Sequence, residues 1–215
     1  MTEPDVALTD YGLALECAVF VFLLYRRSTS RRPLRTWFAV FYVSIGVAAL
    51  AGGTVHGFFL DVRTAGYAVL RPSALIALGG AALSTWAIGA RIQFSLRVVR
   101  LITLCATLVF AVYCALVLFV TQSFSLAIGH YLPGVFFLVV VFSLAYRRTR
   151  ARPVCLALMG LLLALVASGL QQGRVGLHPI YFNHNALYHL LEAVALYLIF
   201  CGARWFLAVP HPREE

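Results

Sequence analysis

Residues 183–197 read NHNALYHLLEAVALY, and they open an apolar run that continues to residue 207. A run of this length is typical of a helix that crosses a membrane, which needs about 20 mostly apolar residues. Its first turns nevertheless carry two asparagines, two histidines and a glutamate: Asn183, His184, Asn185, His189 and Glu192. Ionisable residues inside a membrane are costly and by default mark a functional site. This stretch therefore indicates both a membrane fold and a polar site within it.

The composition of the whole chain also indicates a membrane protein. Its 215 residues are 62% hydrophobic and only 12% charged, whereas soluble domains have about 45–50% apolar and about 25% charged residues. These proportions predict an all-α integral membrane protein that forms one domain, residues 1–215, without a separate soluble part. Seven apolar runs are long enough to cross a membrane as helices, and they lie near residues 7–25, 35–59, 67–90, 99–121, 124–146, 153–172 and 184–207.

The charged residues predict how a bundle of seven transmembrane helices is oriented. All 17 basic residues are arginines, and fourteen of them lie on one side of the bundle, in segments 26–35, 91–100, 147–152 and the C-terminal end. Because arginine-rich loops stay in the cytoplasm, we expect the N-terminus outside and the C-terminus in the cytoplasm. The arginines form no stripe interleaved with aromatic residues, which argues against a nucleic-acid partner. An acidic N-terminal tail fits the outer face: Glu3, Asp5 and Asp10.

With this orientation, five of the predicted helices bring polar side chains into the outer half of the bundle. These residues are Glu16, His56, His130, Ser168, Asn185, His189 and Glu192. Asn185, His189 and Glu192 share one helix face, because they are four and three residues apart. His184 is about 140° from His189 around a helix, so it shares that face poorly. The cytoplasmic half carries no comparable set, and the cluster therefore predicts a site in the outer half.

Imidazoles from different helices with carboxylates nearby are typical of a zinc site. A catalytic zinc ion keeps three protein ligands and one water molecule, which it activates for attack on an amide or an ester. The other polar residues would act as the base or support the ligands: Glu192, Glu16, Asn185, Asp61 and Ser168. The chain has no GxSxG signature of a serine hydrolase.

Two motifs, TVHGFF at 54–59 and HNALYHLLEAVALYLIFCGAR at 184–204, resemble those of the CREST superfamily. That superfamily holds the alkaline ceramidases and the adiponectin- and progestin-receptor proteins, and the chain also looks like a bacterial family of seven-helix proteins within or near it. The resemblance implies zinc bound by His56 and by an HxxxH pair on the last helix, of which His189 is the second member. Asn185 stands in place of the first member, so either the third ligand is His130, which we prefer, or His184 or Glu192, or the metal is lost.

The leading hypothesis is a zinc-dependent membrane hydrolase that cleaves an amide or ester bond in a lipid, located in a bacterial inner membrane. A second hypothesis is a non-enzymatic seven-helix sensor whose polar pocket holds a small ligand or a lipid headgroup. Haem bound by a pair of histidines and a pathway for protons or solutes remain further alternatives. Membrane lipids are the expected partners in the first two cases.

Overall fold

The computed structural model describes residues 1–26, 29–178 and 182–209, and these residues form seven α-helices. The helices are α1 (Pro4–Tyr25), α2 (Arg32–Phe58), α3 (Ala65–Gln93), α4 (Leu96–Phe119), α5 (Phe124–Thr149), α6 (Arg152–Gln172) and α7 (His184–Ala208). The predicted number of helices is confirmed, and every helix end lies within three residues of its predicted position.

Local sequence signals explain where several helices begin. Prolines occupy the first turn of α1, α2 and α6, where the backbone N–H they lack would have no helical partner. At the start of α3, Thr64 Oγ1 accepts a hydrogen bond from the backbone N–H of Tyr67. At the start of α7, Asn183 Oδ1 accepts hydrogen bonds from the N–H groups of Asn185 and Ala186. Asn183 therefore caps the last helix.

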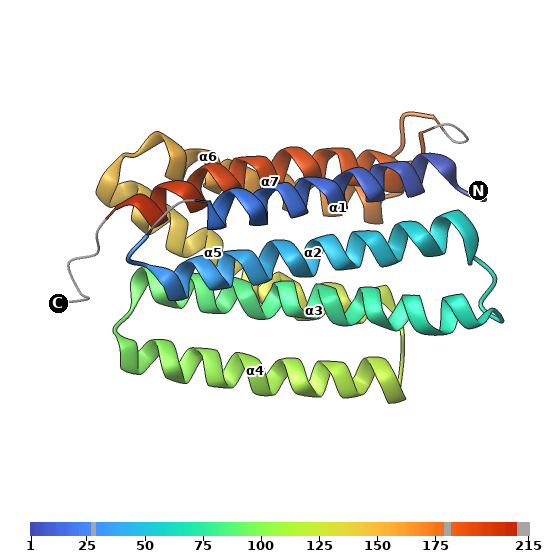
Figure 1. The fold of residues 1–215 in the computed structure, drawn as a ribbon, viewed down its shortest axis with the longest axis horizontal. Coiled ribbons are helices and arrows are strands. Elements are labelled where there is room, and N and C mark those ends of the chain that lie inside the picture. Colours follow the sequence, from blue (N-terminus) through green and yellow to red (C-terminus); the bar gives the residue numbers. More distant parts are fainter. Residues whose placement is uncertain (27–28, 179–181, 210–215) are drawn as a thin grey trace.

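The helices lie side by side and alternate in direction (Figure 1). Helix α1 packs between α2 and α7, α3 packs against α2, α4 and α5, and α6 packs against α5 and α7. Helix α4 packs mainly on α3, and most of its length is exposed apolar surface. Helices α1, α3, α5 and α7 all begin at the end of the bundle that carries the N-terminus, which we call the N-end.

Glycines allow neighbouring helices to approach closely at the level of the polar residues. A Cβ atom on Gly53 of α2 would lie 2.7 Å from Asp10 Cβ and 3.2 Å from the Ala7 carbonyl oxygen of α1. A Cβ atom on Gly160 of α6 would lie 2.6 Å from the Ala195 carbonyl oxygen of α7. Contacts this short exclude any larger residue, so these glycines hold α1 against α2 and α6 against α7, as small residues do in membrane bundles.

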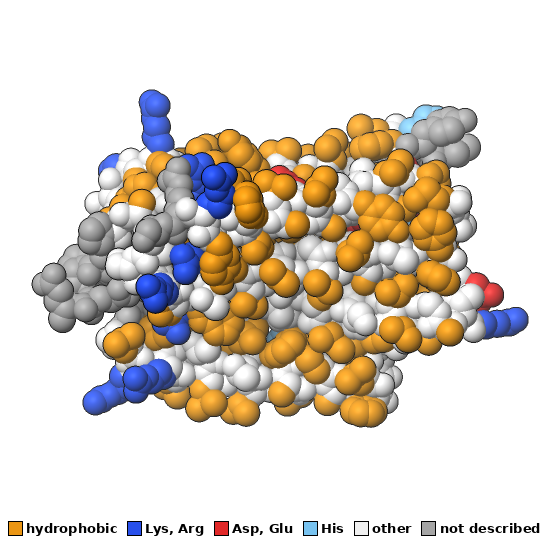
Figure 2. Space-filling model, viewed as in Figure 1, with side chains coloured by type: hydrophobic (Ala, Val, Ile, Leu, Met, Phe, Trp, Pro, Cys, Tyr) orange, Lys and Arg blue, Asp and Glu red, His pale blue; other side chains and the backbone are white. Residues whose placement is uncertain are grey.

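The surface of the bundle is that of an integral membrane protein. Apolar side chains cover the middle of the visible face, while arginines gather at the end opposite the N-end (Figure 2). All seven helices are long and apolar enough to cross a membrane. The side chains exposed along α4 are mainly leucine, valine and phenylalanine, which is the composition expected of a surface in contact with lipid.

Candidate functional site

A cavity of about 350 Å³ lies between the helices and receives side chains from every helix except α4. Near the N-end its lining contains the polar side chains of Asp10, His56, Arg71, Gln171 and Asn185, among apolar ones such as Phe124 and Leu75. Farther from the N-end the lining is mainly apolar, with Phe41, Ile45, Val135, Leu161 and Ile199. Asn185 and Ile199 both line it from α7, so the cavity extends roughly 20 Å along the helix axis. It therefore has one polar end and one apolar end.

His189 of α7 lies at the polar end, and both of its ring nitrogens have partners on α1. Its Nδ1 is 3.2 Å from Thr9 Oγ1, and its Nε2 is 3.3 Å from Asp10 Oδ1. The Thr9 hydroxyl is 2.9 Å from each of the carbonyl oxygens of Asp5 and Val6, which can only accept its proton. Thr9 Oγ1 therefore accepts a hydrogen bond from His189 Nδ1–H, an assignment that follows from the hydrogen-bond network.

This tautomer leaves Nε2 of His189 to face the carboxyl group of Asp10. With one proton on Nδ1, the remaining contact joins Nε2 to a carboxyl oxygen of Asp10. A single proton, either on His189 Nε2 or on the Asp10 carboxyl group, would make this 3.3 Å contact favourable. The pair is then either imidazolium with carboxylate or imidazole with carboxylic acid, and it carries no net charge in either form.

Asp10 was expected in an acidic N-terminal tail, and its place in a tail is wrong. Asp10 lies within α1 and is only 4% exposed. Gly52 and Gly53 of α2 leave room for it: the nearest atom to a Cβ on Gly52 would be Asp10 Oδ2, at 3.5 Å. A sequence signal was available, because Val6, Asp10, Leu13 and Cys17 follow the helical spacing of four, three and four, and all are buried.

His56 of α2 lies at the N-end, where the beginning of the chain folds over the end of α2. Its Nδ1 contacts the carboxylate of Glu3, and the Glu3 N–H donates to the His56 carbonyl oxygen at 3.2 Å. The backbone N–H of Asn183 donates to Asp5 Oδ2 at 3.2 Å. The first residues of the chain thus connect the C-terminal end of α2 to the N-terminal end of α7, at the N-end of the bundle.

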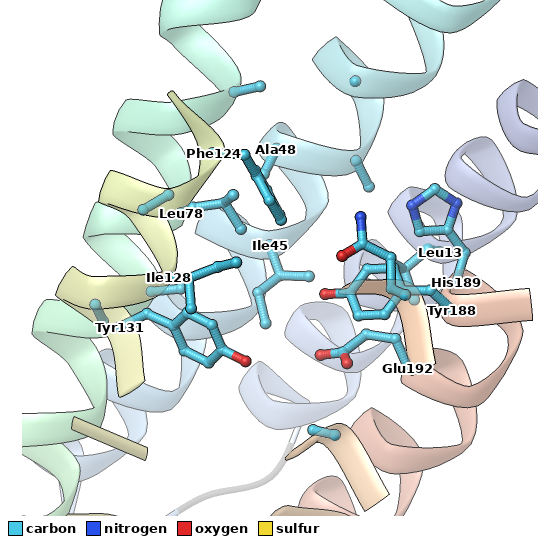
Figure 3. A pocket seen from close by; sticks show the side chains of 18 of the residues that line it. Leu13, Ile45, Ala48, Leu78, Phe124, Ile128, Tyr131, Tyr188, His189 and Glu192 are labelled. Carbon is cyan, nitrogen blue, oxygen red and sulfur yellow. The ribbon is translucent and has the colours of Figure 1, made fainter. Parts of the chain in front are cut away.

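Three oxygen-bearing side chains point toward the same part of the cavity: Tyr131 from α5, and Tyr188 and Glu192 from α7 (Figure 3). The Tyr131 hydroxyl is 2.7 Å from Ser168 Oγ of α6, which therefore supports the cavity wall. Nearer the N-end, Gln171 Nε2 donates to Asn185 Oδ1 at 3.2 Å. Glu192 has no hydrogen-bond partner among residues 1–26, 29–178 and 182–209. Its carboxylate is therefore available to a bound molecule.

His130 does not join His56 and His189, contrary to our expectation. It stacks on the Tyr113 ring of α4 with 4.2 Å between ring centroids. The reason is its angular position, because Ile128 lines the cavity and His130 lies two residues, about 200°, farther around α5. The proposed substitution of His130 for the missing zinc ligand therefore has no support in the fold.

The other predicted site residues occupy different places. Asp61 is exposed in the α2–α3 turn, where Oδ1 accepts the Arg63 N–H at 3.0 Å, and it does not line the cavity. His184 is the first residue of α7 and is half-buried. Glu16 lies on α1 close enough to Glu192 for the two carboxylates to interact. Its buried Oε2 has no hydrogen-bond partner in the described part of the chain.

The side chains present do not fit the three-ligand zinc centre that the resemblance implied. Within the described ranges, no three side chains of His, Cys, Asp or Glu converge so that they could hold a metal ion. His189 uses both of its nitrogens for Thr9 and Asp10, and His56 directs Nδ1 to Glu3. The donors are thus arranged in separate histidine–carboxylate pairs.

Comparison with known proteins adds a family but no activity. The model of a family described as "Family of unknown function (DUF6962)" matches residues 6–207. This range covers all seven helices almost completely, including every residue that lines the cavity. No curated protein and no solved structure matches the chain.

Proposed function

We propose that the chain, which belongs to the DUF6962 family of unknown function, binds an amphipathic small molecule in the cavity between its helices. The observation that carries this proposal is the division of the cavity into a polar end and an apolar end. Its volume of about 350 Å³ lies within the range of roughly 300–1,000 Å³ that is usual for small-molecule pockets. The headgroup would contact the polar residues, and an alkyl chain would fill the apolar part.

The composition of the lining favours an organic ligand over water alone. A buried water molecule needs two to four polar partners, and apolar cavities stay dry. The deep part of the cavity is mainly apolar, with Phe41, Ile45, Val135, Leu161 and Ile199, and the hydroxyl of Thr85, which also lines it, already donates to the Ala82 carbonyl oxygen. An alkyl chain there would contact these side chains and would fill space that water cannot occupy favourably.

The proposal includes an orientation in the membrane. The arginines gather at the end opposite the N-end (Figure 2), and this distribution favours the N-end outside and the opposite end in the cytoplasm. The ligand would then reach the cavity from the outer side of the membrane. A bacterial inner membrane remains our proposal for the location.

Photolabelling tests the binding proposal directly. The protein is reconstituted in lipid nanodiscs and exposed to decanol that carries a diazirine at the end of its chain, and the labelled residues are mapped by mass spectrometry. We expect labels on cavity residues such as Ile45 and Ile128, and we expect unlabelled decanol to suppress these labels at saturating concentration. Labels that lie only on surfaces in contact with lipid, without saturation, would refute the proposal.

A matched pair of variants makes the test specific. Ala49→Phe places a ring in the cavity and should abolish the cavity labels, because Ala49 lines it and is only 5% exposed. Leu108→Phe is the control, since Leu108 is 59% exposed on α4. Labels on the exposed face of α4 should persist in both variants and show that each remains folded in the membrane.

A zinc-dependent hydrolase acting on a lipid amide or ester is the second candidate. The observation in its favour is that His56 and His189, from different helices, line the same cavity. Metal analysis of the purified protein tests it, with His56→Ala, His189→Ala and the control His130→Ala, whose side chain lies apart from the cavity. One zinc per chain that is lost only in the first two variants would establish the zinc site that this function requires. Zinc absent from the wild-type chain and from Asn185→His would exclude it.

A further inference from the structure

We propose that the cavity selects ligands with a cationic headgroup, an ammonium group in the simplest case, and that Glu192 binds this group. The inference rests on the proposed function and adds the chemical class of the ligand to it. It starts from a carboxylate inside the bundle that lines the cavity and has no hydrogen-bond partner in the described ranges of the chain.

Glu192 is placed to receive a headgroup. It lies one turn deeper in α7 than His189, and its carboxylate points into the cavity beside the hydroxyl groups of Tyr131 and Tyr188 (Figure 3). A carboxylate offers about four acceptor positions. A buried carboxyl group either takes up a proton or keeps its charge because a cation or several donors compensate its lost hydration. An ammonium group supplies three N–H donors and the opposite charge, and both tyrosine oxygens can accept from it.

The charges around Glu192 also favour a cation. Glu16 of α1 adds a second carboxylate close enough to interact with Glu192, and its Oε2 has no partner among the described residues. The Asp10–His189 pair lies nearby but is neutral in either protonation form, so it does not offset these charges.

Among the described residues, Arg71 is the arginine that lines the cavity, and its guanidinium group is bound away from Glu192. Arg71 of α3 donates from Nη2 to the carbonyl oxygen of Gln122, in the connection between α4 and α5, at 3.3 Å. Its guanidinium group is thus directed to the edge of the bundle at the N-end. Among the described residues, no cationic side chain forms an ion pair with Glu192, so a cationic ligand can take this position in place of a proton.

Competition for the same photolabel distinguishes headgroup classes. The diazirine-bearing decanol labels the cavity in nanodiscs at pH 7, and unlabelled n-decylamine, n-decanol and decanoate compete for the labelled residues. We expect decylamine to compete at a concentration about 30-fold lower than decanol, since a buried charge pair contributes about 2 kcal/mol or more. Decanoate should be the weakest competitor, because its carboxylate would face Glu192.

Two variants assign the effect to one carboxylate. Glu192→Gln keeps the side-chain size and removes the charge, so decylamine should lose its advantage over decanol. Asp61→Asn removes an exposed carboxylate outside the cavity, and the advantage should remain. Equal competition by all three compounds in the wild type, strongest competition by decanoate, or an advantage unchanged in Glu192→Gln would each overturn the inference. In those cases saturable labelling of the cavity would still support the proposed function, whereas absence of cavity labels would remove both.

Discussion

At the scale of single residues, the site consists of carboxylates that differ in what they contact. Asp10 lies 3.3 Å from His189 Nε2 and is held by the close approach of α1 to α2. Glu3 contacts His56 at the N-end. Glu192 has no such partner in the described part of the chain, and for this reason we assign the ligand to it and not to Asp10.

The contact between Asp10 and His189 Nε2 leads to a prediction about Asp10. Asp10→Ala leaves His189 Nε2 buried without a partner, which should lower the free energy of unfolding by about 1–3 kcal/mol. Asp10→Asn should be milder, because the amide can donate to Nε2 and keep the pair neutral. Unfolding of both variants in the same detergent provides the comparison. Equal losses of stability would show that the assignment of the proton between these residues is wrong.

At the scale of helices, the polar end of the cavity depends on how closely α1 approaches α2. Three glycines of α2 lie against α1: Gly46 faces Cys17, Gly53 faces Asp10 and Gly57 faces Ala7. This packing places Asp10 beside His189 of α7, since α1 lies between α2 and α7. A small increase in the distance between α1 and α2 would therefore move Asp10 relative to His189, even with every side chain of the lining unchanged.

Two neighbouring glycines test this dependence. Gly53→Ala would bring a methyl group to 2.7 Å from Asp10 Cβ, and overpacking of this kind costs about 1–3 kcal/mol. Gly52→Ala is the matched control, because its methyl group would meet Asp10 Oδ2 at an ordinary 3.5 Å. We expect Gly53→Ala to melt at a lower temperature and to lose cavity photolabelling, and Gly52→Ala to retain both. The reverse order would contradict the packing described for α1 and α2.

At the scale of the whole molecule, the helices enclose a cavity whose charged side chains lie in the half nearer the N-end and whose deeper lining is mainly apolar. Six of the helices contribute to its lining, whereas α4 packs outside them on α3. The direction from which a ligand enters therefore depends on which side of the membrane the N-end faces.

A topology measurement tests the proposed orientation. A reporter fused after residue 215 should be active in the cytoplasm, and an epitope tag at residue 2 should be accessible from outside intact cells. The physical reason is the excess of arginine at the end of the bundle opposite the N-end (Figure 2). A reporter that is active only outside the cytoplasm would reverse the orientation and the proposed side of ligand entry.

The sequence by itself determined the seven helices, their ends and the capping of α7 by Asn183. These features depend on local signals: apolar runs of sufficient length, prolines in first turns and a side chain that can reach the next N–H groups. The sequence also predicted that His189 and Glu192 share a face of α7, because helical spacing alone decides this.

Only the tertiary structure decided which side chains meet. Asp10 is buried and His130 faces α4 because packing sets the rotation of each helix about its axis, and spacing within one helix carries no information on that rotation. The same packing paired His56 with Glu3 and His189 with Asp10, in place of the expected metal cluster. It left Glu192 facing the cavity without an ion-pair partner among the described residues.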